Sequence, residues 1–191
     1  SEGHDVRYGL LTHGERGVSP AYPTGDVLVP TRFEEQKRAA KVLGVEDIHY
    51  FDYPDGYLVP DLEMRKAVAR FIRKMRPQIV VGCDPLNYYS SGTYLNHPDH
   101  RAAGQILVDS VFPAVGNPSF FPEFLNEGLE PLQLHELWLS LPVTPNIELD
   151  VDDFYEQKIT ALLEHRSQIG EPEQFRKNMM ERRITHLNPE G

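Results

Sequence analysis

The sequence predicts an α/β fold, Rossmann-like, with a mostly parallel sheet and helices on both of its faces. Short apolar segments that suit strands alternate with amphipathic segments of helical length, which is typical of βαβ units. Glycine, proline and aspartate residues occur in the connections between these segments. The chain has 191 residues, enough to bury one core, so residues 1–191 are expected to form a single domain.

The first third of the chain reads as strand, loop, helix. Residues 6–12 form a short apolar run that favours a buried strand. Residues 13–30 are rich in glycine and proline and indicate a loop. Thr31 and Glu34 have the spacing of a capping box, which predicts a helix starting at Thr31. Gly44 is a suitable C-terminal stop for that helix.

The rest of the chain continues the alternation. Residues 48–51 and 78–83 suggest two further strands. Between them, Asp61 is a good cap for a helix that Pro77 ends. The later predicted elements are a helix from His97 to about 111, strands at 134–141 and 147–151, and a last clear helix from 152 to about 166.

The first residues resemble the end of a helix more than the start of a domain. Gly3, a polar pair and then a strand is the order that usually follows a helix. A helix, and a strand before it, are therefore expected upstream of Ser1. The fold that the sequence predicts is therefore expected to lack its N-terminal strand and helix.

Composition narrows the classes of function and the compartment. The formal net charge is −10 and no cluster of lysine and arginine stands out, which disfavours nucleic acid as a partner. Cys83 is the only cysteine, so the chain forms no internal disulfide, which suits a reducing compartment and predicts a cytoplasmic protein. No apolar stretch approaches the ~18 residues of a membrane span.

The segment Asn96-His97-Pro98-Asp99-His100-Arg101 carries the clearest chemistry. Pro98 suits the first position of a helix, and Asp99 suits its positive end. His97 and His100 are three residues apart, so both side chains project from one side of the first turn. Two imidazoles beside a carboxylate make half of a metal site, but a catalytic zinc usually takes three protein ligands. The competing interpretation is a plain helix start with two surface histidines.

Several motifs, in order, resemble the PIG-L/LmbE-like N-deacetylase family. Members of this family are metal-dependent hydrolases that remove acetyl groups from N-acetylglucosamine-type substrates. The family's Ala-His-Pro-Asp-Asp segment, which supplies a histidine and an aspartate to the metal and another aspartate as the base, is missing here. The matching segments are T-H-G-E-R-G at 12–17, Arg32 and Glu35 of an R-x-x-E helix ending in Leu43-Gly44, Y-P-D-G at 53–56, Arg76-Pro77, H-P-D-H-R at 97–101 and H-R-S-Q at 165–168.

The resemblance implies a role for each of five residues. His100 is the metal ligand, and Zn²⁺ is the expected metal, although other divalent ions suit such donors. His97 lies near the scissile carbonyl and stabilises or protonates the tetrahedral intermediate, and Asp99 orients it. Arg32 and Asp55 hold the sugar. Without the resemblance, Arg32 reads as a surface helix arginine and Asp55 as a turn aspartate.

Other residues are weaker candidates. His13 occupies a variable position of its motif and is a poor third ligand, and Glu15 reads equally as a site residue or as a cap of a backbone turn. His165 reads as a structural histidine whose positive charge suits a helix end. Three loop tyrosines line a sugar pocket or simply pack: Tyr88, Tyr89 and Tyr94.

The expected partner is a small N-acyl amino sugar, with a homo-oligomer left open. As given, the chain is expected to bind zinc weakly and to show little activity, because two ligands and the base are absent. Two alternatives remain. One is a catalytically incompetent fragment or degenerate scaffold that binds a sugar or sugar-nucleotide without hydrolysis. The other, a nucleotide binder, is disfavoured because neither G-x-G-x-x-G nor a P-loop is present.

Overall fold

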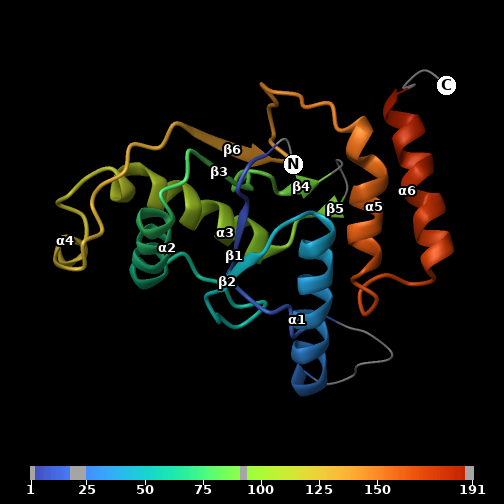
Figure 1. Ribbon diagram of the computed structural model, residues 1–191, viewed down its shortest axis with the longest axis horizontal. Helices are drawn as coiled ribbons and strands as arrows, with labels where there is room; N and C mark the ends of the chain where they lie inside the picture. Colours follow the sequence, from blue (N-terminus) through green and yellow to red (C-terminus); the bar gives the residue numbers. More distant parts are fainter. Residues whose placement is uncertain (1–2, 18–24, 91–93, 188–191) are drawn as a thin grey trace. The chain divides into compact units, whose positions relative to one another are not determined.

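A computed structural model describes residues 3–17, 25–90 and 94–187, and Figure 1 follows the chain from blue to red. The chain divides into two compact units. Unit 1 combines Ser1–Asp55 with Leu149–Gly191, and unit 2 is Gly56–Glu148. Parallel strands and helices confirm the predicted α/β class. In the described residues the parallel strands form two separate pairs, one in each unit, where one continuous sheet was expected.

The strand pair of unit 1 brings two predicted loops together. Strand β1 (Arg7–Leu10) runs parallel to β2 (Asp47–Tyr50). The pairing continues past both strands, because the N–H groups of Phe51 and Tyr53 donate to the carbonyls of Leu10 and Leu11, each at 2.9 Å. The chain segments that follow β1 and β2 therefore leave the sheet side by side.

Helix α1 spans Gly25–Val42, so the predicted start at Thr31 is wrong by six residues. The Thr31 hydroxyl donates to the carbonyl of Val27, one turn back, and so lies inside the helix. Leu28, only 1% exposed, explains the earlier start, because burying it stabilises a first turn that has no strong local signal. The predicted stop is confirmed by Gly44, whose φ is +76°.

Helix α5 (Tyr155–Leu163), which follows the short 3₁₀ turn η2 (Asp152–Phe154), packs between α1 and α6 (Pro172–Leu187), as Figure 1 shows. The last of these helices was not predicted, because its residues are mostly polar. The strand predicted at 147–151 is wrong: these residues are irregular and exposed. Apolar alternation there has no strand to pair with among the described residues.

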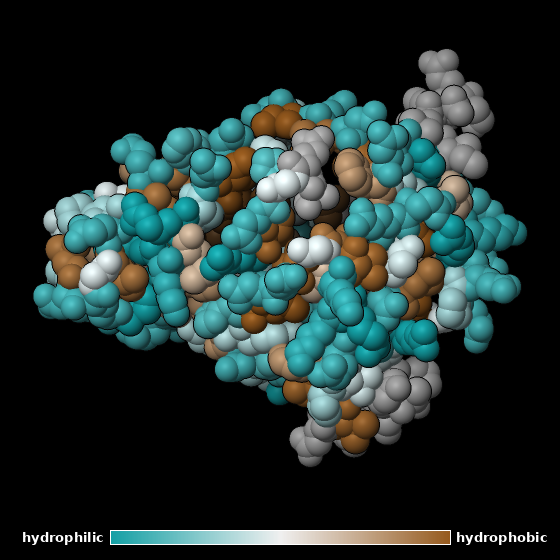
Figure 2. All heavy atoms as spheres, in the orientation of Figure 1, coloured by the Kyte–Doolittle hydropathy of each residue, from teal (hydrophilic) through white to brown (hydrophobic). Residues whose placement is uncertain are grey.

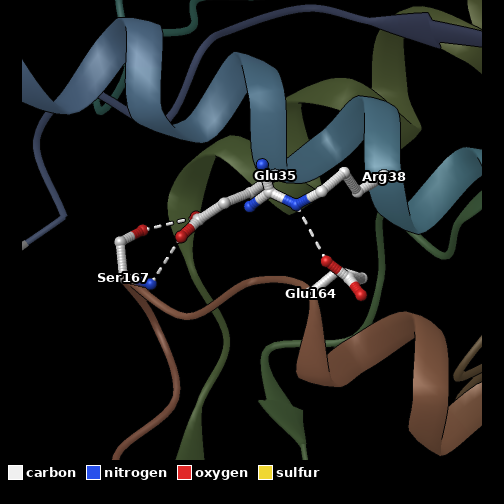
Figure 3. A network of polar contacts seen from close by, with 4 residues as sticks. All are labelled: Glu35, Arg38, Glu164 and Ser167. Carbon is white, nitrogen blue, oxygen red and sulfur yellow. Dashed lines mark hydrogen bonds and ion pairs between the residues drawn. The ribbon is translucent and has the colours of Figure 1, made fainter.

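A buried carboxylate joins α1 to the chain after α5 (Figure 3). Glu35 is 2% exposed and accepts hydrogen bonds from the backbone N–H and the hydroxyl of Ser167, at 2.7 and 2.6 Å. One turn on, the Arg38 guanidinium donates to the carboxylate of Glu164 at 2.8 Å. These contacts close unit 1 around residues from both ends of the chain.

In unit 2, β3 (Ile79–Cys83) runs parallel to β6 (Glu136–Ser140). Helix α3 (Pro98–Asp109) packs against β3 and continues into the π-helical turn η1 (Ser110–Val115). Gly104 permits the close packing, since a Cβ there would collide with the carbonyl oxygen of Cys83.

Helix α2 (Leu62–Met75) packs on α3 and η1 of the same unit. Its start is as predicted, because the Asp61 carboxylate accepts from the N–H of Met64 at 2.8 Å. Beyond it, α4 (Glu123–Asn126) is a single turn. A two-stranded antiparallel hairpin, β4 (Tyr89–Ser90) and β5 (Tyr94–Leu95), lies between β3 and α3, where no strand was predicted.

Arg73, on α2, is 1% exposed and binds backbone carbonyls of η1 and of the residues just after it. Its guanidinium donates to the carbonyls of Ala114 and Asn117 at 2.8 Å and of Val115 at 3.1 Å. Desolvation lowers the pKa of Arg73 below its ordinary value. Among the residues that the structure describes, no helix is both long and apolar enough to cross a bilayer.

Candidate active site

The two histidines of the H-P-D-H segment stand at the first turn of α3. Pro98 opens the helix, and His97 is its N-cap, with Nδ1 accepting from the N–H of Asp99 at 3.2 Å. The rings of His97 and His100 are 5.6 Å apart between centroids, and both residues are exposed. The helix start therefore presents two neighbouring imidazoles to solvent.

The cap also determines where the proton of His97 lies. Because Nδ1 accepts a hydrogen bond from Asp99, the neutral imidazole carries its proton on Nε2. His97 thus offers an N–H donor on the side of the ring away from its own helix. A carbonyl oxygen that gains negative charge would be stabilised by such a donor.

Asp99 is 6% exposed, and its carboxylate accepts from the backbone N–H groups of Gly56 at 2.6 Å and Leu58 at 3.3 Å. The carboxylate therefore holds the segment after the Y-P-D-G turn against the start of α3. The contact with His97 is made by the backbone N–H of Asp99. Sequence reasoning did not find the hydrogen bonds from Gly56 and Leu58 to the Asp99 carboxylate, because they join residues about forty positions apart.

Asn96 and Arg101 form a frame around this helix start that sequence reasoning did not single out. Asn96 is 8% exposed, and its side-chain amide donates to the carbonyl of Asn87 at 2.9 Å. The Arg101 guanidinium donates to the carbonyl of Asn96 and lies 4.4 Å above the ring of Tyr88. The only sequence signal for them was their position on either side of H-P-D-H.

In unit 1, Arg32 is inserted into the loop after β1. Its guanidinium donates to the carbonyl of Gly14, and a Cβ at Gly14 or Gly17 would collide with it. Two of the glycines of the T-H-G-E-R-G segment therefore make room for this one side chain. Arg32 is half-buried and is not the free surface arginine of the competing interpretation.

Asp55 is hydrogen-bonded to Glu15 and to Arg16 and so joins the two loops that leave β1 and β2. The backbone N–H of Asp55 donates to Glu15 Oε1 at 2.7 Å, and the carboxylate of Asp55 accepts from the N–H of Arg16 at 3.0 Å. His13 adds a third link, with Nε2 2.7 Å from the Asp52 carboxylate, and its ring stacks on Tyr50 at 4.7 Å.

These loops also hold polar atoms that have no partner. Five buried side-chain polar atoms lack a hydrogen bond in the described part of the chain, and four belong here: His13 Nδ1, Glu15 Oε2, Arg32 Nε and Tyr50 Oη. Desolvation raises the pKa of Tyr50 from 10.0. Such groups are costly unless something hydrogen-bonds to them, so the loops are chemically suited to a ligand with several hydroxyls.

The fit to a metal is partial. Across residues 3–17, 25–90 and 94–187, no group of three or more histidine, cysteine, aspartate or glutamate side chains is arranged to hold a metal ion. His97 and His100 are suitable donors, but a catalytic zinc normally takes three protein ligands. The described residues by themselves therefore do not form the three-ligand set of a catalytic zinc site.

The five predicted site residues are divided between the units. Arg32 and Asp55 belong to unit 1, and His97, Asp99 and His100 belong to unit 2. Within each unit they lie as described above. The expectation that all of them open onto one cavity spans both units and stays a prediction.

An α/β fold with H-P-D-H at the start of a helix, after the end of a parallel strand, is the arrangement that the sequence motifs implied. The chain belongs to the PIG-L family. The model of that family, described as GlcNAc-PI de-N-acetylase, matches residues 1–111. The resemblance drawn from the motifs is thereby confirmed.

Known relatives and structures agree with this family. Over 169 residues the chain is 38% identical to the diacetylchitobiose deacetylase of Thermococcus kodakarensis (strain ATCC BAA-918 / JCM 12380 / KOD1), covering 88% of this chain and 61% of the relative. Over 173 residues it is 27% identical to the probable N-acetyl-alpha-D-glucosaminyl L-malate deacetylase 2 of Bacillus anthracis. This match covers 86% of this chain and 69% of the relative. The chain thus spans about three fifths of the length of the first relative.

Among solved structures, the chain resembles the N,N'-diacetylchitobiose deacetylase of Pyrococcus horikoshii, complexed with its inhibitor MPG. The TM-score is 0.83 at 31% identity, and the match covers 93% of this chain and 66% of that chain. The described fold is therefore that of a deacetylase of the same family.

Proposed function

We propose that this chain acts as a metal-dependent hydrolase that removes an acetyl group from an N-acetylglucosamine-type amide. The observation that carries the proposal is the start of α3, where His97 directs an Nε2–H outward beside the imidazole of His100. The acyl sugars named for the relatives support a small-molecule substrate of this class. The lone Cys83 supports a cytoplasmic location.

His100 is the proposed metal ligand, with zinc as the preferred ion. A bound zinc ion would polarise the amide carbonyl and lower the pKa of bound water from ~16 towards ~7. Imidazole donors also suit other divalent metals. Because the described residues offer fewer than three grouped ligands, we expect this 191-residue chain to hold zinc weakly.

His97 has the proposed role of stabilising or protonating the tetrahedral intermediate. Its Nε2–H would donate to the carbonyl oxygen as negative charge develops there. The backbone N–H of Asp99 holds the ring in the orientation and tautomer that this role needs. The buried Asp99 carboxylate, in turn, fixes the helix start through Gly56 and Leu58.

Arg32 and Asp55 are proposed to hold the sugar. Asp55 lies in a loop of unit 1 and Arg32 reaches the neighbouring loop from α1, and buried polar atoms of His13, Glu15 and Arg32 have no partner there. A sugar hydroxyl both donates and accepts, so it suits a mixed group of this kind. Replacing Arg32 by alanine should chiefly raise KM, since such contacts are made equally in the ground state and the transition state.

One alternative rests on a specific observation. No three-ligand group is present among the described residues, which favours, as the alternative, a scaffold that binds the sugar without hydrolysing it. Metal content and turnover, measured on the same sample, distinguish the two functions.

The test measures amine release from N-acetylglucosamine and N,N'-diacetylchitobiose with added zinc, alongside metal content by elemental analysis. The variants are read in a version of the chain to which the family's Ala-His-Pro-Asp-Asp segment has been added. There, His100→Ala should lose metal and activity together, and His97→Ala should keep the metal and lower kcat by about 10²- to 10⁴-fold, the usual contribution of a general acid or base. His135→Ala, an exposed histidine of the same unit, is the control and should change neither.

The outcomes separate the candidates. Sugar binding without amine release, at full zinc occupancy, would favour the non-hydrolytic scaffold. Amine release that survives both His97→Ala and His100→Ala would show that the reaction uses other residues.

A further inference from the structure

Two polar side chains that precede α3 in unit 2, Asp84 and Asn96, are buried, at 7% and 8% exposed. Most polar side chains stay in contact with water, and Figure 2 shows hydrophilic residues over much of the visible surface. A buried carboxylate or amide is stable only where the protein hydrogen-bonds to it. The partners of these two side chains therefore show what they hold together.

Asp84 joins the two chain segments that leave β3 and β6. Its Oδ1 accepts from the N–H of Leu86 at 2.9 Å, two residues on, which is the turn that aspartate favours. Its Oδ2 accepts from the N–H of Val143 at 2.9 Å, in the segment after β6. In α/β folds, sites form beyond the carboxyl ends of parallel strands. The Asp84 carboxylate therefore organises the chain at the end of the sheet where function is expected.

Asn87 connects this carboxylate to Asn96. The side-chain amide of Asn87 donates to the carbonyl of Leu141 at 2.7 Å, so Asn87 also fastens its own loop to the segment after β6. Its backbone N–H lies 3.4 Å from the carbonyl oxygen of Asp84, and its own carbonyl accepts from the Asn96 amide. The order that Asp84 imposes at the strand ends thus continues to the residue before α3's cap.

Asn96 directly precedes His97 and is held on three sides. Its N–H donates to the carbonyl of Tyr88 at 2.9 Å, its amide donates to Asn87, and its carbonyl accepts from Arg101. The ring of His97 itself is exposed, and its Nδ1 contact with the backbone N–H of the cap, at 3.2 Å, is at the long end of the usual range. The backbone that Asn96 fixes therefore contributes strongly to where this ring points.

We propose that Asp84 and Asn96 are positioning residues, which fix the backbone before α3 and so the direction in which His97 presents its Nε2–H. This inference rests on the proposed function, in which that N–H donates to the carbonyl oxygen. Neither side chain needs to touch the substrate. A donor that is aimed in advance loses nothing to reorganisation when charge develops. A misplacement of about 1 Å can lower a rate by about 10²-fold.

Hydrogen exchange at the amide of Asp99 reports the position of His97 without substrate or metal. This N–H is protected while it donates to His97 Nδ1. In the 191-residue chain, Asp84→Ala and Asn96→Ala should each speed exchange of this amide about tenfold, the usual size of one hydrogen bond. Asp84→Asn keeps one acceptor oxygen and should give a smaller increase.

The amide of Met64 is the internal control in the same spectra. It donates to the Asp61 carboxylate at the start of α2, another helix cap in unit 2. Its exchange should be unchanged in Asp84→Ala and Asn96→Ala. Asp61→Ala is the matched control variant, and should speed exchange of the Met64 amide while leaving that of Asp99 unchanged.

Kinetics provide a second readout, in the version of the chain that carries the added Ala-His-Pro-Asp-Asp segment. There, Asp84→Ala and Asn96→Ala should lower kcat by up to about 10²-fold and leave KM nearly unchanged, because the misplaced donor acts in the transition state. Asp61→Ala should change neither constant. The pattern is the opposite of that expected for Arg32→Ala.

Equal acceleration at Asp99 and Met64 would show that Asp84 and Asn96 only stabilise unit 2, and would overturn the inference. An unchanged Asp99 amide in Asn96→Ala would also overturn it, and this variant decides if Asp84→Ala fails to fold. Exchange as expected without amine release in the extended chain would contradict the proposed hydrolase and leave the positioning of His97 standing. Amine release with kcat unchanged in both variants would keep the hydrolase and overturn the positioning role.

Discussion

His165 shows how burial changes the chemistry of one residue. The sequence favoured a positively charged histidine at a helix end, but desolvation lowers the pKa of His165 from 6.5, opposed by the charge of Glu35. The neutral imidazole is therefore the form that the fold favours. The structure replaces the expected charge–dipole contact with a half-buried, neutral side chain.

The lowered pKa of His165 predicts a pH dependence of stability. Between the folded pKa and 6.5 the unfolded chain binds more protons than the folded one, so the free energy of unfolding rises with pH. The contribution of His165 is complete above pH 6.5 and is lost as pH falls through the folded pKa. In urea titrations, His165→Gln should reduce the loss of stability below pH 6.5. An unchanged pH profile in His165→Gln would contradict this assignment.

At the scale of elements, Glu35 connects α1 to the segment after α5. Removing it leaves the N–H and hydroxyl of Ser167 without their acceptor, so Glu35→Ala should lower the free energy of unfolding by about 3 kcal/mol. Ser167→Ala, which removes one of the two bonds, should cost about 1 to 2 kcal/mol. Urea denaturation followed by circular dichroism measures both.

Glu34, the neighbouring carboxylate on α1, is the control for Glu35. Its side chain is 59% exposed and pairs only with Lys37 in the contacts described, so Glu34→Ala should cost less than about 0.5 kcal/mol. Similar losses in the two variants would show that Glu35 acts through helix propensity and not through Ser167.

Elements were predictable where their signals are local. Asp61 and Pro77 mark the ends of α2 correctly, because a cap and a proline act on their own turn of the chain. The start of α1 was misplaced because burial of Leu28, a tertiary effect, decides it. The hairpin β4–β5 was missed, since strands of two residues are too short to show a period.

In the candidate site, too, local features were predictable from the sequence and long-range contacts were not. Pro98 and Asp99 were enough to predict that His97 and His100 share a helix start. The partners of the Asp99 carboxylate at Gly56 and Leu58 were not predictable, because no pattern in the sequence relates the two segments. The glycines around Arg32 became meaningful only once the guanidinium was seen between them.

At the scale of the whole molecule, the lack of a three-ligand group among the described residues predicts a weak thermodynamic response to zinc. A ligand that binds only the folded state stabilises it by about 0.4 kcal/mol at a concentration equal to Kd and by about 2.7 kcal/mol at 100 times Kd. Micromolar zinc should therefore raise Tm only slightly, and His100→Ala should abolish even that shift. Calorimetry with EDTA-treated chain measures the effect, with His135→Ala as the control. A large rise in Tm at equimolar zinc would show that a complete site exists.

Arg73 has a consequence for the order in which unit 2 folds. Its guanidinium satisfies carbonyls that lie more than forty residues further along, in η1 and just after it. If α2 buried this cation before those carbonyls were in place, the charge would be left without hydrogen-bond partners. Helix α2 and the segment around 114–120 therefore acquire native structure as one cooperative unit, and local opening of either exposes the other.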